Sequence, residues 1–208
     1  MKTHVLFLAL VLVPFLLNAQ TKVTRTLSSF DKIGISGGYD KVYLKEGDAE
    51  SIVLETKGID PENILTEVSE GTLRIKTKNG HWNNFSATLT ITYRKLTSIA
   101  TSGSSDIESL SVIRASDFKL ATSGSGDVKA EFDVKNLHVA ISGSSDMTLK
   151  GKAEEQSIAI SGSGDVDASK LNGEAADVAI SGSGDVRLGV KGKVKTSVSG
   201  SGNVTNNK

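Results

Sequence analysis

Five aspartates hold the same place in a repeated motif, and they are the residues of this chain best suited to bind a cation. The motif Ser-Gly-Ser-Gly-Asp occurs six times, at spacings of 21, 19, 19, 20 and 18 residues, with Ser for the second Gly in two copies and Asn for Asp in the last. Stacked Gly-x-Gly-x-Asp turns supply carboxylates to Ca²⁺ in calcium-binding repeat proteins. The candidate cation column consists of Asp106, Asp127, Asp146, Asp165 and Asp185.

A structural role is the main alternative for these carboxylates. Calcium-binding repeats of this kind are nonapeptides that begin with a Gly pair, whereas this repeat is about 20 residues long and lacks the pair. Stacked carboxylates about 4.8 Å apart repel each other by roughly 1 kcal/mol in water. They can coexist if they face solvent and accept hydrogen bonds from backbone N–H groups at a turn. We therefore expect mainly corner capping, with weak cation binding and a ligand face as the alternatives.

The segments around each motif alternate with the period of a β-strand. Two apolar or Thr residues flank one small residue before each motif, and an apolar residue follows each acid, as in Ile158-Ala159-Ile160 and Val166. A unit of this size cannot bury its own apolar face and must stack on its neighbours. The sequence predicts an all-β fold, a parallel β-helix (solenoid) with coils of about 20 residues over residues 96–206. Each coil should contain a strand, a Gly-rich corner, a strand and a variable return loop.

Residues 30–101 show the same alternation without the tight repeat. Ala87, Leu89, Ile91 and Tyr93 alternate with threonines, which is typical of a half-buried strand. We expect irregular N-terminal β-strands here, which either form less regular coils or fold over one end of the solenoid. A Pro near a first-turn position at Asp60-Pro61-Glu62-Asn63 predicts one helical turn.

A line of small residues runs beside the motif on the face opposite the apolar pairs. A solvent-facing strand usually carries Thr, Lys or Glu, so a flat and weakly apolar stripe indicates that something packs on it. That partner could be a layer of the same chain or a second subunit in a homo-oligomer. The possible interface stripe consists of Ala100, Ala121, Ala140, Ala159 and Ala179.

One aromatic loop interrupts the strands. It contains His81, Trp82, Asn83 and Asn84, followed by Phe85, and it holds the only Trp of the chain. An exposed Trp beside amide side chains could stack on a sugar, which makes this a possible ligand loop. The alternative is that Trp82 and Phe85 fill the junction between the N-terminal strands and the first coil.

The composition argues against several classes of function. The formal net charge is zero and both signs are interspersed, so no nucleic-acid footprint is present. The chain contains no Cys and no nucleophile-elbow, phosphate-loop or zinc-binding motif, so we expect no cofactor and no enzyme activity. His138 is expected to face solvent from its strand. A carbohydrate-active enzyme is the rival on this scaffold, but it would need acids clustered on one irregular patch.

The first residues have the features of an export signal. Lys2 precedes an apolar stretch over residues 5–17, and a small-residue context follows at Asn18-Ala19-Gln20. We expect residues 1–19 to be a signal peptide and the mature chain to have no transmembrane segment, since no later apolar run approaches the length of about 20 residues. The predicted location is the periplasm, the cell surface or the medium.

The N-terminal strands and the repeat together resemble a known family. The carrying residues are Phe30-Asp31-Lys32-Ile33, the stretch from Ile35 to Leu44, Lys45-Glu46-Gly47-Asp48 and the Ser-Gly-Ser-Gly-Asp-Val array. They resemble the DUF2807 family, the putative autotransporter adhesin head GIN domain, found in secreted proteins of Bacteroidetes. The resemblance implies a single GIN-type β-helix domain over residues 30–206.

We expect the protein to be an exported, non-enzymatic structural or adhesive binding module of the bacterial cell envelope, and adhesion is the part of this that the resemblance implies. Its partners would be a second copy of the chain or an envelope protein or glycan, and not nucleic acid. The alternatives are a carbohydrate-active β-helix enzyme and a calcium-dependent repeat protein.

Overall fold

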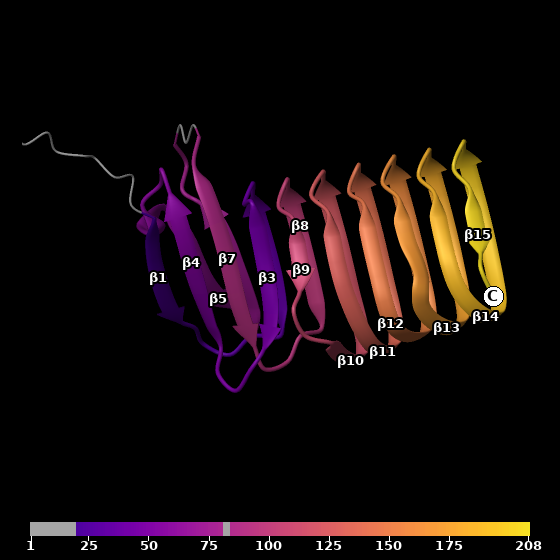
Figure 1. The fold of residues 1–208 in the computed structure, drawn as a ribbon, viewed down its shortest axis with the longest axis horizontal. Coiled ribbons are helices and arrows are strands. Elements are labelled where there is room, and N and C mark those ends of the chain that lie inside the picture. Colours follow the sequence, from indigo (N-terminus) through magenta and orange to yellow (C-terminus); the bar gives the residue numbers. More distant parts are fainter. Residues whose placement is uncertain (1–19, 81–83) are drawn as a thin grey trace, which may run out of the picture.

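The computed structural model describes residues 20–80 and 84–208 and confirms the predicted parallel β-solenoid. The predicted signal peptide and three residues of the aromatic loop (His81, Trp82 and Asn83) lie outside these ranges. Figure 1 shows the coils stacked along one axis, from the N-terminal strands at one end to β15 at the other.

Two groups of strands build the stack. The strands before the repeat, with one 3-10 turn among them, are β1 (Thr21–Thr26), β2 (Lys32–Gly37), β3 (Lys41–Glu46), β4 (Ser51–Lys57), η1 (Pro61–Asn63), β5 (Ile64–Ser69), β6 (Thr72–Thr77) and β7 (Ser86–Tyr93). The strands of the repeat are β8 (Ser98–Gly103), β9 (Ile107–Ser109), β10 (Ile113–Gly124), β11 (Val128–Gly143), β12 (Met147–Gly162), β13 (Val166–Gly182), β14 (Val186–Gly200) and β15 (Val204–Asn206).

Each regular coil contributes to two layers that meet at the motif. We call the strands that lead into the corners the entry layer and the strands that leave them the exit layer. Neighbouring coils pair in parallel with like residues in register, so that Ala140 lies beside Ala159 and Val128 beside Met147. Because side chains alternate along a strand, each layer buries one apolar face between the layers and presents the other to solvent.

The side of the coil opposite the motif differs from the sequence prediction of a return loop. In β11, β12, β13 and β14 the strand continues through the bend without interruption. The coils differ in length there, and the pairing absorbs the difference in register shifts, for example between Ala168 and Asn172. The buried Gln156 contributes to this bend, where its Nε2 donates to the Leu171 carbonyl at 3.2 Å.

The N-terminal strands combine both of the arrangements that the sequence left open. β2 and β3 form a coil that stacks in parallel on β8 and β9, and β6 and β7 form another that stacks on β2 and β3. In contrast, β1, β4 and β5 pair antiparallel and lie at the far end of the stack. The predicted helical turn is present as η1, where the Asp60 side chain accepts from the Glu62 N–H.

A continuous apolar core fills the space between the layers. It runs from Ile52 and Leu54 at the N-terminal end to Leu188 and Val190 in the last coil, all fully buried. Phe118 and Phe132 pack at its centre with ring centroids 5.1 Å apart. The inward pair of the last coil, Thr196 and Val198, is not buried: both side chains are exposed, Val198 to 43 %, because no further coil of the described chain covers them.

Candidate binding surfaces

The predicted acidic column lies along the edge where the two layers meet, and its carboxylates cap the corners. The Oδ1 atom of each acid accepts a hydrogen bond from the backbone N–H of the acid in the next coil, over distances of 2.7–3.4 Å. The last of these bonds runs from the Asn203 N–H to Asp185 at 2.9 Å. A carboxylate is a strong acceptor for an N–H group that would otherwise be unpaired at the turn. The geometry therefore gives each acid one role within the corner.

The first acid of the column also forms an ion pair. Lys41 Nζ lies 3.0 Å from Asp106 Oδ2. Partial burial raises the pKa of Asp106, but the hydrogen bonds from Lys41 and from the Asp127 N–H outweigh it, and the pKa is lowered overall. The same hydrogen bond raises the pKa of Lys41. In residues 20–80 and 84–208 no group of three His, Cys, Asp or Glu side chains is placed to hold a metal ion. Cation binding by the column remains a prediction.

Glycine in the corner is required by the close approach of successive coils. Gly143 has φ of +133°, and a Cβ atom built there would lie 2.3 Å from the carbonyl oxygen of Gly124 in the preceding coil. The second Gly of the motif lacks a positive φ and is Ser in two copies, but where Gly stands the coils approach as closely: a Cβ atom at Gly126 would lie 2.1 Å from the Ser105 carbonyl oxygen. In the first copy Ser105 is buried, accepts from the Tyr39 N–H at 2.9 Å and donates to the Gly37 carbonyl at 3.1 Å.

The predicted alanine stripe is exposed on the outer face of the entry layer. Its members lie in register from coil to coil, and Ser197 continues the line in the last coil. A row of exposed motif serines runs parallel to it, from Ser123 to Ser199. Together the two rows line a groove of about 780 Å³, along which the walls change little from one coil to the next. The groove crosses the strands and follows the long axis of the solenoid.

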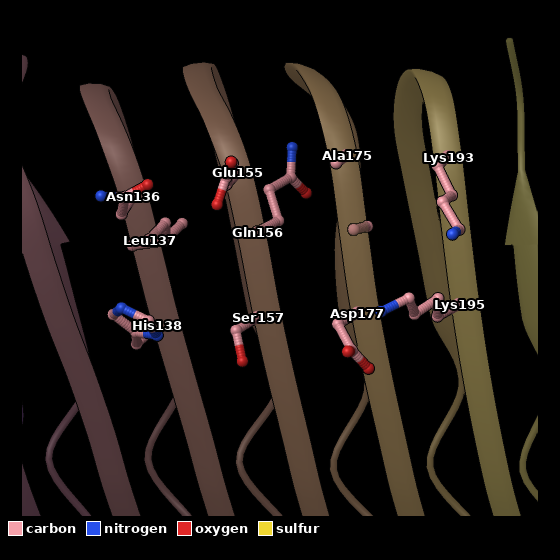
Figure 2. Close-up of a pocket in the computed structure, with 11 residues that line it drawn as sticks. Asn136, Leu137, His138, Glu155, Gln156, Ser157, Ala175, Asp177, Lys193 and Lys195 are labelled. Atoms are coloured by element: carbon pink, nitrogen blue, oxygen red, sulfur yellow. The ribbon is translucent and has the colours of Figure 1, made fainter.

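A polar depression lies beside this groove on the same face and was not predicted from the sequence. Figure 2 shows its lining side chains on four successive coils. It has a volume of about 530 Å³, and small residues at Ser157 and Ala175 leave it open. Its rim contains two acidic residues, Glu155 and Asp177, and two basic residues, Lys193 and Lys195. The polar residues that line it and are not buried are Asn136, His138, Glu155, Ser157, Asp177, Lys193 and Lys195.

A sequence signal for this depression does exist. His138 stands two residues before Ala140, and side chains two residues apart on a strand lie on the same face. The outward row that includes Lys119, His138, Ser157, Asp177 and Lys195 can therefore be read directly from the position of the alanine stripe. What the sequence alone does not give is the hollow, because its depth depends on side chains from neighbouring coils.

The aromatic loop stands between β6 and β7 in the sequence, and its residues His81, Trp82 and Asn83 lie outside the described ranges. Of the predicted ligand residues, the structure describes Asn84, which is exposed with φ of +57°. Phe85 is partly buried and packs against the core, as the junction-filling alternative requires of it. Asn84 and Phe85 precede β7 in the N-terminal part of the stack, whereas β11 to β14 line the polar depression, so these two described residues are not part of it.

A seventh corner precedes the six copies of the motif. Ser36, Gly37 and Asp40 hold the places of Ser, Gly and Asp, and Ser36 and Gly37 pair with Ser102 and Gly103. Asp40 caps in the other direction, because its Oδ2 accepts from the Ala87 N–H of the preceding coil in the stack at 3.0 Å. The spacing of 66 residues to the next copy conceals this corner in the sequence.

Comparison with known families gives one match. The family described as "Putative auto-transporter adhesin, head GIN domain" (DUF2807) matches residues 29–207. No curated protein matches the chain. In the part of the chain that the structure describes, no helix has the length and apolar character needed to cross a membrane.

Several solved structures share the fold at low sequence identity. A putative adhesin from Parabacteroides merdae has a TM-score of 0.76 and 18 % identity, over 91 % of this chain and 96 % of that one. A putative adhesin from Bacteroides fragilis has a TM-score of 0.75 and 20 % identity, over 90 % and 97 % of the two chains. A putative lipid binding protein from Parabacteroides distasonis has a TM-score of 0.68 and 18 % identity, over 91 % and 97 %. These similarities establish the fold.

Proposed function

This chain belongs to the DUF2807 family, and we propose that it is an exported, non-enzymatic binding module of the bacterial cell envelope that adheres to its target through the outer face of the entry layer. The observation that carries the proposal is the groove along the alanine stripe. An exposed, weakly apolar surface that continues across successive coils is the kind of surface on which a partner packs.

The groove favours an elongated ligand over a compact one. The alanines and serines that line the groove repeat about every 4.8 Å along the solenoid axis, so a chain-like ligand contacts the same residue types in each coil. The serine row supplies hydroxyl groups along one side of the groove, which can donate to or accept from a glycan. A repeated surface of this kind provides many weak and equivalent contacts, which suits adhesion.

A non-enzymatic role is supported by the way the acids are distributed. The carboxylates of the column are spaced one per coil, and an oxygen of each is already bonded to a backbone N–H. Glycoside hydrolysis needs a pair of carboxyl groups on opposite sides of one bond, with distinct roles. The regular column offers a series of equivalent acids instead.

Lipid binding is the second candidate, and the adjoining depression is the observation that favours it. The apolar groove and the mixed-charge depression are contiguous, since Ala140 and His138 are two residues apart on one strand face. An amphiphile could place its acyl chain in the groove and its polar head group beside Lys195. One protein of the same fold is described as a putative lipid binding protein.

The two candidates can be separated by assaying binding to an array of bacterial glycans and to phospholipid vesicles. The variants Ala140→Lys and Ala159→Lys place a charge in the groove without touching the core, and both should lose binding. Thr148→Lys is the matched control, because Thr148 is exposed on the exit layer of the same solenoid. Retention on glycans supports adhesion and retention on vesicles supports lipid binding. Native-like binding by both groove variants would exclude this face as the binding surface.

A further inference from the structure

The last coil leaves one edge of the entry layer without a partner strand. Residues 193–200 pair with β13 on one side, and in the described part of the chain no strand pairs with their other side. The inward side chains are uncovered as a result: Val198 is 43 % exposed, whereas Ile180 at the same place in the preceding coil is 2 % exposed. An unpaired edge with uncovered apolar side chains is a template for another strand. In Figure 1 this edge forms the C-terminal end of the stack.

The opposite end of the entry layer has a matching edge in β5. Among the described strands it pairs with β6 alone, and it is the last strand of the sheet at that end. Its inward Val68 is partly buried and packs against the core. Arg25 covers part of the end, because its guanidinium donates to the carbonyls of Ile64 at 2.6 Å and of Pro61 at 2.8 Å. Its Nη1 also donates to Thr66 Oγ1 at 3.0 Å, so the contact of Arg25 with Thr66 is through the side chain, and the backbone of Thr66 and Val68 has no partner strand on this side in the described residues.

The directions of these two edges fit antiparallel pairing between copies. The entry-layer strands from β6 to β14 run in parallel, and β5 runs antiparallel to β6. If a second copy continues the axis of the first, β14 of one copy meets β5 of the other in opposite directions. Antiparallel pairing between such edges gives straight hydrogen bonds.

The free backbone groups also lie at matching positions. The Asn63 carbonyl accepts from Lys78 on the β6 side, so alternation turns the groups of Thr66 and Val68 to the free edge. In β10 the Lys119 N–H donates to the preceding coil. Lys195 holds the same register position in β14. Val194 and Thr196 are its neighbours along the strand, and backbone groups of neighbouring residues point to opposite sides of a strand. Their backbone groups therefore face the free edge too. A register with Val194 opposite Val68 and Thr196 opposite Thr66 joins like inward side chains.

The same register brings opposite charges together on the outer face. Lys195 then stands directly opposite Glu67, and both side chains are exposed. A directly opposed pair of opposite charge stabilises antiparallel strands. The two segments also differ in charge, because residues 186–208 contain five Lys or Arg and no acid, while residues 58–71 contain four acids, of which Glu62 is paired with Arg25 and Glu67 lies beside Arg74 of β6. Unlike charges at the two ends of one molecule favour contact between the end of one copy and the start of the next.

From the free edges, their register and their charges, we propose that this chain associates head to tail, with β14 of one copy pairing with β5 of a second copy. The contact is heterologous, so it repeats and builds an open linear assembly that extends the solenoid. It uses the two ends of the molecule and leaves the groove of the entry layer exposed, so it does not depend on the proposed function. A rod of several copies would present the groove many times over.

The test is sedimentation velocity of the purified protein from micromolar to millimolar concentration, at low and at high salt. We expect mass to grow with concentration and to fall as salt screens the Lys195–Glu67 contact. Lys195→Glu alone and Glu67→Lys alone should each be monomeric, because each places like charges in the joint. An equimolar mixture of the two variants restores unlike charges at every joint and should associate again.

Lys119→Glu is the matched control, since Lys119 lies in the same outward row as Lys195 but within the stack. It should associate like the native protein. Circular dichroism of each variant checks that the fold is retained. The proposal is overturned if the native protein stays monomeric at millimolar concentration. It is also overturned if Glu67→Lys associates like the native protein, which would indicate pairing between two C-terminal ends.

Discussion

The corner carboxylates offer a direct test of whether the acidic column caps the fold or serves a cation. Asp146 occupies the middle of the column, and its Oδ1 accepts from the Asp165 N–H at 3.0 Å. Asp146→Ala removes the acceptor, whereas Asp146→Asn keeps an oxygen in place and removes only the charge. Asn203 already holds this place in the last copy of the motif, so the amide is compatible with the corner.

The expected magnitudes differ for the two variants. A hydrogen bond to a charged group contributes about 1.5–3 kcal/mol, and exposure to solvent reduces this, so Asp146→Ala should lower the free energy of unfolding by about 1–2 kcal/mol. For a domain of this size that corresponds to about 3–6 °C in Tm. Asp146→Asn weakens the bond but relieves repulsion of roughly 1 kcal/mol from each neighbouring acid, so its stability should stay near that of the native protein. Lower salt should favour the Asn variant further.

Urea denaturation and thermal denaturation at two salt concentrations, with and without calcium, measure these effects. If Asp146→Asn lost as much stability as Asp146→Ala, the charge and not the acceptor would matter, and corner capping would be refuted. If millimolar calcium raised the Tm of the native protein but not that of Asp146→Asn, the column would be a cation site. An unchanged Tm with calcium and with chelator removes cation binding.

Three further predictions concern the corner, the core and the N-terminal end. Gly143→Ala should lower the free energy of unfolding by at least about 2 kcal/mol, because of its positive φ and the close carbonyl, while Gly38→Ala, which meets no atom within 4 Å, should have little effect in the same urea titration. Burial, reinforced by Glu46, raises the pKa of Tyr93 to about 12, so the unfolded chain loses this proton first and stability should fall as pH rises from about 10 to about 12. Tyr93→Phe should remove that part of the decline, as followed by denaturation at fixed pH, and an unchanged slope would contradict the assignment. Arg25→Met should cost about 2 kcal/mol by leaving backbone carbonyls at the end of the stack unpaired, and hydrogen exchange should show faster exchange in β5; equal exchange would exclude the capping role.

The regular half of the fold could be predicted because each coil repeats the same pattern of apolar and polar residues. Apolar alternation identifies the inward face, and a period near 20 residues identifies the stacked coil, since no unit can bury its own face. The N-terminal half could not be ordered in the same way. Ser36 and Gly37 belong to a corner of the same type, but the elements from β3 to β7 separate them from the next copy, and pairing across such a distance leaves no local signal.

The sequence by itself determined the all-β class, the positions of the six motif corners and the alternation that places Ala140 on the outside and Ile141 on the inside. These follow from strand periodicity and from the conformations that glycine allows, which are local properties of the chain. Only the tertiary structure decided the shape of the outer face, the contacts of the corner carboxylates and which strand edges are unpaired. The hollow beside His138 exists because side chains of four coils differ in size, and the carboxylate of Asp146 meets the N–H of Asp165 because successive coils stack in register. The free edge of β14 likewise depends on which strands lie beside it, and residues distant in sequence decide that.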